Sequence, residues 1–216
     1  ASKRGTVFVY RNDKKQLALS ENQDRIIFES SDSGTADFQL LTAQPKLKFL
    51  YKANEVTTDL VGAYNFVNCI AAMAMGEYFG VEEEELIKAI ATYTPDNNRS
   101  QLVKTNKNLL LLDAYNANPT SIRLAIESFV SEETDANKLI ILGDMLELGS
   151  YAAKEHQNTV ELLKEHPTIK VYFVGENFYK IKSKNPHMYF YRTRLDLEEL
   201  LKSRPVTASY ILLKGS

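Results

Sequence analysis

The residues best suited to hold a ligand follow a run of four leucines near the middle of the chain. After residues 109–112, positions 113–121 read Asp-Ala-Tyr-Asn-Ala-Asn-Pro-Thr-Ser. The leucines predict a buried strand, and Asn118 followed by Pro119 is typical of a helix N-cap and first helical position. Asp113 is therefore expected at the carboxyl end of a strand, where open α/β sheets bind their ligands. A carboxylate and several amides at that place predict a hydrogen-bonding site.

Three other apolar runs end on polar or small residues in a similar way. Asp144, Gly175 and Lys214 each lie just past such a run. Because the carboxyl ends of parallel strands emerge at one edge of a sheet, these residues and Asp113 are expected to form one polar rim. Each residue alone is typical of a turn, but the four together predict a ligand-binding edge without identifying the ligand.

The elements that must position this rim alternate along the second half of the chain. Apolar patterns predict strands at 109–112, 138–142, 170–174, 188–191 and 210–213, and helices at 119–130, 152–165, 177–181 and 196–202. This alternation indicates an α/β fold: a Rossmann-like, mostly parallel sheet with right-handed crossovers.

The first half has a different pattern. Runs of β-branched and aromatic residues predict short strands at 6–10, 25–28 and 47–51, with turns at 12–13 and 30–34, whereas 17–19 fits a helical turn or a strand. Helical spacing predicts one helix up to Tyr78, ended by Gly80, and a second from Glu82 that ends before Pro95. The polar stretch 95–98 predicts a hinge. We therefore expect a strand-rich, two-helix domain over 1–96 and a second domain over 97–216.

Composition limits the class of protein. The 216 residues are 44% hydrophobic and 25% charged, with a net charge of −2, which is ordinary for a globular protein and gives no support for nucleic-acid binding. The single cysteine, Cys69, excludes an internal disulfide and suits a reducing compartment. No segment resembles a membrane span or a signal-peptide core, so we expect a cytoplasmic protein without a membrane partner.

Several common sites are missing from the sequence. It contains neither Gly-x-x-x-x-Gly-Lys-Ser/Thr nor Gly-x-Gly-x-x-Gly, so a glycine-rich phosphate loop is absent. The three histidines have no zinc-like spacing with one another or with Cys69. We therefore expect no catalytic residue and no metal ligand in this chain.

Three segments together resemble the Mur ligase family. Residues 62–72, Gly-Ala-Tyr-Asn-Phe-Val-Asn-Cys-Ile-Ala-Ala, are similar to the family pattern Gly-x-His-Asn-x-x-Asn-x-x-Ala-Ala. The second segment is Asn-Arg-Ser at 98–100 followed by residues 113–121, and the third is Leu-Gly-Asp-Met-Leu-Glu-Leu-Gly at 142–149 with His156 downstream. The last two, in this order, most resemble the branch of the family that adds D-Ala-D-Ala to UDP-MurNAc-tripeptide, and Lys214, Gly215 and Ser216 also fit.

The resemblance implies an ATP-dependent ligase of peptidoglycan precursor synthesis that forms an amide bond through an acyl phosphate. It also implies that the chain is incomplete, with the end of the central ATP-binding domain in 1–96 and the carboxyl-terminal domain in 97–216. The phosphate loop and the Mg²⁺ ligands would then lie upstream, so this fragment alone is expected to be inactive. The implied partners are UDP-MurNAc-tripeptide and D-Ala-D-Ala, and the expected state is a monomer.

The resemblance also implies site residues. Asn68 and Asn65 would meet the adenine, Arg99 the nucleotide phosphates across the hinge, and Asp113 the ribose hydroxyls. For Asn65 and Asn68 the alternative is a helix cap and a polar helix face, and for Arg99 it is a surface ion pair. The residues expected at the dipeptide are Tyr115, Asn116, Asn118, Thr120 and Lys214.

Two features of this pattern bear on specificity. The related ligase that adds a diamino acid carries Asp-Asn-Pro-Arg, whereas this chain has Ala-Asn-Pro-Thr at 117–120, and an uncharged Thr120 favours a dipeptide without a charged side chain. Tyr64 stands where the family pattern has histidine and cannot carry an imidazole charge. The alternatives are a non-catalytic nucleotide- or peptide-binding Rossmann-like module, and a sister ligase of the diamino-acid-adding or folylpolyglutamate type.

Overall fold

The computed structural model of the chain describes residues 5–31 and 36–216. Of the turn expected at 30–34, positions 32–34 lie outside the described residues. Contacts divide the chain into two compact units, residues 1–94 (unit 1) and 95–216 (unit 2), and each is described by itself.

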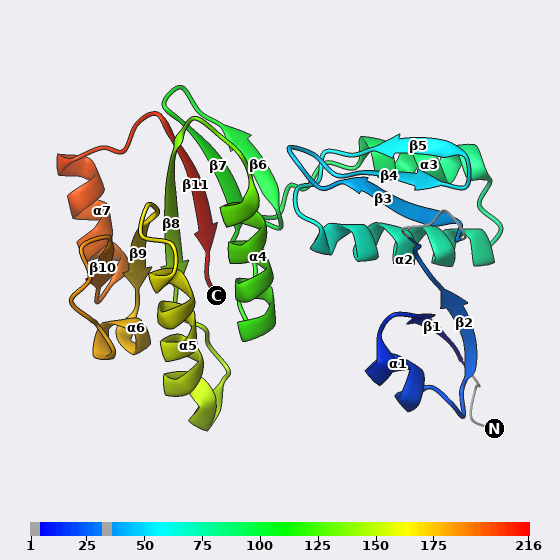
Figure 1. Cartoon of the computed structure of the whole chain (residues 1–216), viewed down its shortest axis with the longest axis horizontal. Helices are drawn as coiled ribbons and strands as arrows, with labels where there is room; N and C mark the ends of the chain where they lie inside the picture. Colours follow the sequence, from blue (N-terminus) through cyan, green and yellow to red (C-terminus); the bar gives the residue numbers. More distant parts are fainter. Residues whose placement is uncertain (1–4, 32–35) are drawn as a thin grey trace. The chain divides into compact units, whose positions relative to one another are not determined.

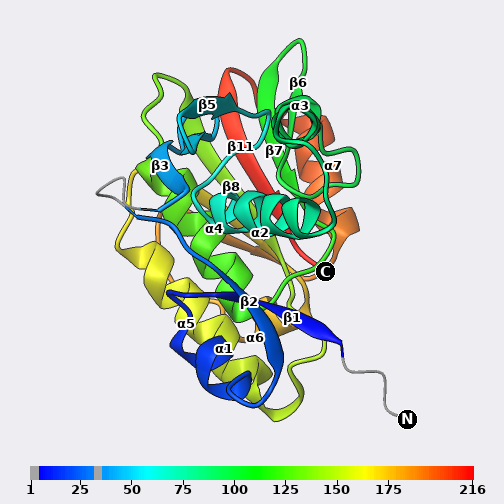
Figure 2. The same ribbon diagram turned by 90° about the vertical axis from the view of Figure 1, so that its right-hand side faces the viewer.

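Unit 1 combines a parallel pair of strands, an antiparallel three-stranded sheet and three helices. Its strands are β1 (Thr6–Tyr10), β2 (Asp24–Phe28), β3 (Phe38–Thr42), β4 (Lys48–Tyr51) and β5 (Asn54–Thr57). Its helices are α1 (Lys14–Leu19), α2 (Tyr64–Tyr78) and α3 (Glu83–Thr92). In both ribbon views α2 lies between the β1–β2 pair and the three-stranded sheet (Figures 1 and 2).

The core of unit 1 forms where α2 packs on the three-stranded sheet. Phe66 of α2 and Phe49 of β4 are both buried, with ring centroids 5.5 Å apart. Ile70 and Met73, one and two turns further along α2, are also almost fully buried. The helical spacing of these apolar residues explains which face of α2 is turned to the sheet.

Unit 2 is an α/β domain with one six-stranded sheet in the order β10-β9-β8-β11-β7-β6. Its strands are β6 (Gln101–Lys104), β7 (Asn108–Asp113), β8 (Asn137–Gly143), β9 (Lys170–Val174), β10 (Met188–Tyr191) and β11 (Ser209–Lys214). Its helices are α4 (Pro119–Ser131), the 3-10 turn η1 (Gly149–Tyr151), α5 (Ala152–Lys164), α6 (Glu176–Lys180) and α7 (Arg194–Ser203). Five strands run parallel, and only β6 is antiparallel to its neighbour β7.

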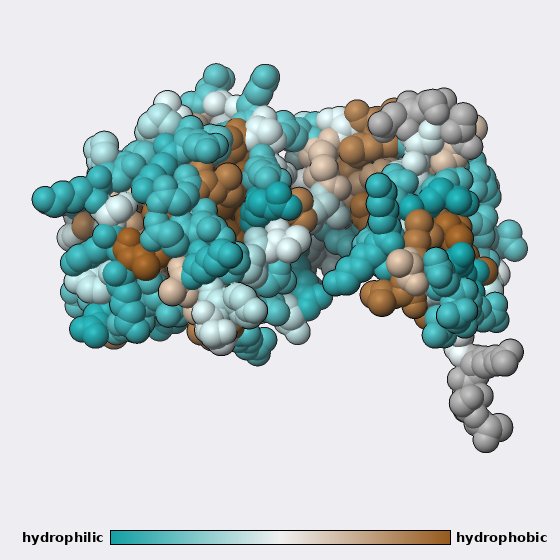
Figure 3. Space-filling model, turned by 60° about the horizontal axis from the view of Figure 1, so that its bottom comes forward, coloured by the Kyte–Doolittle hydropathy of each residue, from teal (hydrophilic) through white to brown (hydrophobic). Residues whose placement is uncertain are grey.

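Helices cover both faces of this sheet, and neighbouring residues of one strand show which helix packs on which face (Figure 1). Tyr210 packs against Phe129 of α4, with ring centroids 4.7 Å apart, whereas the next residue, Ile211, joins a buried cluster with Leu197 of α7. Since successive side chains of a strand point to opposite faces, α4 and α7 lie on opposite sides of the sheet. Figure 3 shows apolar side chains reaching the surface of each unit in patches among polar ones.

The expected mostly parallel α/β sheet and its alternating helices are confirmed. Residues 17–19 belong to α1, because Asp13 caps that helix by accepting hydrogen bonds from the backbone N–H groups of Lys15 and Gln16. Strands β3, β5 and β6 were not expected from the sequence. Each is only four or five residues long, and such short strands give little periodic signal.

Candidate functional site

The carboxyl ends of the central strands of unit 2 form one edge, as the sequence predicted. Lys214 of β11 pairs with Asp113 of β7 on one side and with Leu142 of β8 on the other. At the end of the sheet a Cβ atom on Gly215 would lie 3.1 Å from the Cα of Gly143. Glycine at both positions therefore lets the ends of β8 and β11 approach closely at this rim.

An ion pair joins two of the four rim residues. Nζ of Lys214 donates to Oδ2 of Asp113 at 2.6 Å, and the exposed fractions of the two side chains are 2% and 15%. Oδ1 of Asp113 accepts the backbone N–H of Ser100 at 3.2 Å. The parallel register of β7 and β11 places these two residues side by side, which explains why a lysine can be buried here.

The loop after β7 is held to the end of β11. Lys214 Nζ also lies 3.4 Å from the carbonyl oxygen of Asn116, and the N–H of Ala117 donates to Oγ of Ser216 at 3.0 Å. Asn118 then caps α4, because its Oδ1 accepts the N–H of Ser121 at 2.9 Å. The expected Asn118 cap and Pro119 start are confirmed. The chain therefore fixes the loop backbone, while Asn116 and Asn118 remain exposed to solvent.

Arg99 and Tyr115 form an exposed stack beside this loop. The guanidinium carbon of Arg99 lies 3.6 Å from the centre of the Tyr115 ring. Asn98 and Ser100, on either side of Arg99, have positive φ angles of 57° and 50°, a conformation that non-glycine residues seldom adopt. The permanently charged guanidinium of Arg99 thus lies on the face of the Tyr115 ring. Its N–H groups can bind an anion through paired hydrogen bonds.

The remaining rim carboxylate has a structural partner. Asp144 caps α6 by accepting the backbone N–H groups of Asn177 at 2.9 Å and Phe178 at 3.1 Å. Burial raises the pKa of Asp144, but the hydrogen bonds from these two N–H groups lower it, and its pKa lies below the usual value. The Asp144 carboxylate is therefore ionised, and both of its oxygens already accept hydrogen bonds from α6.

His156, which the sequence singled out only as part of the third segment, lies fully buried behind the rim. Its Nδ1 donates to the carbonyl oxygen of Ala152 at 2.7 Å, and its Nε2 accepts the N–H of Met145 at 3.0 Å. The imidazole therefore carries its proton on Nδ1 and fixes the start of the segment after β8. The Ala152–His156 spacing of one helical turn could have indicated the first bond, but nothing in the sequence indicated the second.

In unit 1 the two asparagines of α2 differ in their surroundings. Asn65 is buried, and its Nδ2 donates to the carbonyl oxygen of Val61 at 2.7 Å. Asn68 is exposed and donates from Nδ2 to Oδ1 of Asn65 at 3.2 Å. The amide oxygen of Asn68 has no partner among residues 5–31 and 36–216, so Asn68 can still accept a hydrogen bond from a ligand. Asn65 instead orients Asn68.

Thr120 lies at the second position of α4 and lines a small cavity between α4 and α5. The cavity has a volume of about 230 Å³, and Arg123 and Glu155 also line it. The uncharged Thr120 therefore shares this cavity with one cationic side chain, Arg123, and one anionic side chain, Glu155.

Neither a metal cluster nor a reactive thiol is found in the described part of the chain. No group of three or more histidine, cysteine, aspartate or glutamate side chains could hold a metal ion there. Burial raises the pKa of the Cys69 thiol to about 11, so it is inert. None of the described helices is long and apolar enough to cross a bilayer.

Sequence comparison connects this rim to known proteins. Residues 98–215 match a family model described as the Mur ligase, glutamate ligase domain. The UDP-N-acetylmuramoyl-tripeptide–D-alanyl-D-alanine ligase of Bacillus subtilis is 32% identical over 171 residues, which make up 76% of this chain and 37% of that protein.

Solved structures show the same fold at lower identity. MurF from Acinetobacter baumannii matches with a TM-score of 0.80 and 22% identity, over 99% of this chain and 49% of that one. The MurF ligase of Thermotoga maritima, solved in complex with ADP, matches with a TM-score of 0.75 and 19% identity, over 100% of this chain and 51% of that one. The chain thus spans about half the length of these proteins, or less.

Proposed function

The chain belongs to the Mur ligase family, and we propose that it forms part of an ATP-dependent ligase that adds D-Ala-D-Ala to UDP-MurNAc-tripeptide. The observation that carries this proposal is the rim of unit 2. There the buried Asp113–Lys214 pair holds a loop of exposed, uncharged side chains next to the Arg99–Tyr115 stack. The loop after β7 offers hydrogen bonds from the uncharged side chains of Asn116, Asn118 and Thr120, which suits a dipeptide without a charged side chain. The likeness to the dipeptide ligase of B. subtilis supports the same substrate.

For the nucleotide we propose separate contributions from each unit. In unit 1, Asn68 accepts from and donates to the adenine edge, and Asn65 orients it. In unit 2, Arg99 binds the phosphates and the free lone pairs of Asp113 accept the ribose hydroxyls. ATP would supply the phosphoryl group that activates the tripeptide carboxylate. From the resemblance to the Mur ligase family, the ligands for Mg²⁺ are expected in other parts of the full-length protein.

For the dipeptide we propose Tyr115, Asn116, Asn118 and Thr120. The amide of Asn116 and the free amide nitrogen of Asn118 would hydrogen-bond the peptide group, and the capped start of α4 favours its carboxylate. Lys214 acts as a positioning residue, because its ammonium group is buried against Asp113 and the loop backbone. Positioning of the dipeptide amine in this way is a large source of rate acceleration in ligation.

We propose that the enzyme works in the cytoplasm as a monomer, because the reaction uses ATP and a UDP-linked peptide and every proposed contact comes from one chain. The test is ATP-dependent product formation by the full-length protein, followed by mass spectrometry. UDP-MurNAc-tripeptide with D-Ala-D-Ala should give the pentapeptide product, while single amino acids should give none. Product with a diamino acid instead would favour the sister ligase, and nucleotide binding without any product would favour a non-catalytic module.

A further inference from the structure

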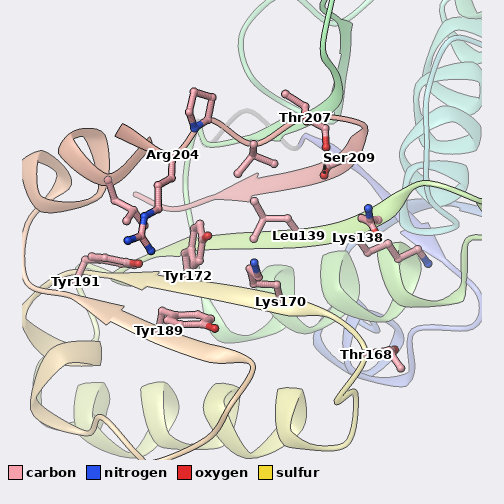
Figure 4. A pocket seen from close by; sticks show the side chains of 14 residues that line it. Lys138, Leu139, Thr168, Lys170, Tyr172, Tyr189, Tyr191, Arg204, Thr207 and Ser209 are labelled. Atoms are coloured by element: carbon pink, nitrogen blue, oxygen red, sulfur yellow. Dashed lines mark hydrogen bonds between the residues drawn. The ribbon is translucent and has the colours of Figure 1, made fainter. Parts of the chain in front are cut away.

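A larger cavity lies on the face of the unit 2 sheet that α7 covers. It has a volume of about 760 Å³, which is within the range of small-molecule sites. It extends from the carboxyl end of α7, with the loop that follows, over the amino ends of β8, β9 and β11 to Tyr191 at the carboxyl end of β10 (Figure 4). None of the residues proposed for ATP or the dipeptide lines it.

One buried tyrosine in this cavity lacks a polar partner. Only 6% of Tyr172 is exposed, yet its hydroxyl has no hydrogen-bond partner among the residues that the structure describes. Tyr189 and Tyr191 of the neighbouring strand β10 hold its ring edge-on, each with a centroid distance of 5.6 Å and an interplanar angle of 83°. The Tyr172 hydroxyl is not among the fully buried polar atoms, so it is open to the cavity and can donate a hydrogen bond to a ligand or to water. Tyr172 therefore marks a place for an acceptor atom.

The charge of the lining is entirely positive. Arg204 and Lys170 line the cavity, no aspartate or glutamate does, and neither cation has a carboxylate partner among the described residues. Figure 4 shows Arg204 extending toward Tyr191. Lys138 also lines the cavity, but its ammonium group donates to carbonyl oxygens at the end of α4. Two free cations remain to bind an anion.

The tyrosine hydroxyls can donate to such an anion. Burial raises the pKa of Tyr172, and Tyr189 adds to the rise, while burial is also the main cause of the raised pKa of Tyr191. Both hydroxyls are therefore protonated at neutral pH. Leu200 and Val206 add an apolar wall.

We infer that this cavity binds a small organic phosphate, whose phosphate lies against Arg204, Lys170 and the Tyr172 hydroxyl. A phosphate group offers a charge close to −2 and three strong acceptor oxygens, which match two cations and the neighbouring hydroxyl donors. The aromatic and apolar lining suits the organic part of the ligand. This site is independent of the proposed ligase activity, because none of its lining residues is proposed to bind ATP or the dipeptide.

The test is a titration of the 216-residue chain with phenyl phosphate, followed by calorimetry and by NMR of tyrosine-labelled protein. We expect saturable binding that shifts the Tyr172 and Tyr189 signals, with a dissociation constant on the order of 1 mM or lower for so small a probe. Phenol and inorganic phosphate should each bind at least about tenfold more weakly, because each lacks one half of the recognised group.

Variants locate the binding site. Arg204→Gln should weaken phenyl phosphate binding about tenfold, and Tyr172→Phe, which keeps the ring, about fivefold. Lys202→Gln removes an exposed cation of α7 that does not line the cavity, and it should leave binding unchanged. Absence of saturable binding, equal binding of inorganic phosphate, or equal loss in the Lys202 variant would overturn the inference. None of these results depends on ligase activity.

Discussion

Lys214 and Asp113 form a buried ion pair 101 residues apart in sequence, with Nζ and Oδ2 2.6 Å apart. The two partners are not equivalent. Lys214 is 2% exposed, whereas Asp113 is 15% exposed and also accepts the N–H of Ser100. Removal of Asp113 therefore leaves a buried cation without a partner, whereas removal of Lys214 leaves a carboxylate that water can reach.

This asymmetry predicts different losses of stability. Asp113→Ala should lower the free energy of unfolding by about 3 kcal/mol or more, and Lys214→Met by less, because only the former leaves an unpaired buried charge. Hydrogen exchange of the β7 and β11 amides in the 216-residue chain measures both. Equal losses, or a larger loss for Lys214→Met, would show that the burial of Lys214 does not set the cost.

The Asp113–Lys214 pair shows which features of the site could be predicted from the sequence and which could not. The leucine run before Asp113 and the apolar run before Lys214 predicted two parallel strands with these residues at one edge. Strand order and register were not predictable, because they depend on packing of the whole sheet rather than on local periodicity. Asp144 illustrates the same limit, since its partners in α6 are more than 30 residues away.

Stability should also depend on pH through Asp144. Because the folded state lowers its pKa, the stability it contributes is fully present above its ordinary pKa of 3.8 and is lost as the pH falls through the lower folded value. Asp144→Asn should cost about 1.5–3 kcal/mol at neutral pH, the usual value of hydrogen bonds to a charged group. Thermal unfolding of both proteins across this range should show the difference shrinking below pH 3.8. A difference that is constant with pH would contradict the assigned role.

Substitutions of the two asparagines of α2 should have different effects, one on stability and the other on KM for ATP. Asn65→Ala should lower the free energy of unfolding by about 1–3 kcal/mol, because it leaves the buried Val61 carbonyl unpaired. Asn68→Ala should change stability by less than about 0.5 kcal/mol, since the side chain is exposed, and should raise KM for ATP in the full-length protein. An unchanged KM would make Asn68 merely a polar residue of the helix surface.

Arg99 should not tolerate replacement by lysine. Lysine keeps the charge but loses the planar group that stacks on Tyr115 and donates two parallel hydrogen bonds. We expect Arg99→Lys to raise KM for ATP about fivefold or more in the full-length protein. Arg194→Lys, an exposed change on α7 beside Glu198, is the matched control and should have no effect. Similar values for both variants would make Arg99 a surface cation without a role.

Specificity for the dipeptide should depend on Thr120. Thr120→Arg should lower kcat/KM for D-Ala-D-Ala about tenfold, by placing a cation in a site for an uncharged side chain. Glu155 in the same cavity would limit the loss by pairing with the new charge. Lys182→Arg is the surface control. Equal values in the two variants would place the dipeptide at another part of the rim and leave the family assignment unchanged.

The central claim is that the rim binds the nucleotide through Asp113, and two variants that break the same ion pair test it. In the full-length protein, Asp113→Ala should raise KM for ATP about 5- to 150-fold and change KM for D-Ala-D-Ala much less, because a hydrogen-bonded carboxylate is lost from the ribose. Lys214→Met breaks the pair but keeps that carboxylate, so its KM for ATP should rise much less. If both variants raise KM for ATP equally, or neither does, Asp113 only supports the fold and the proposed nucleotide site is wrong.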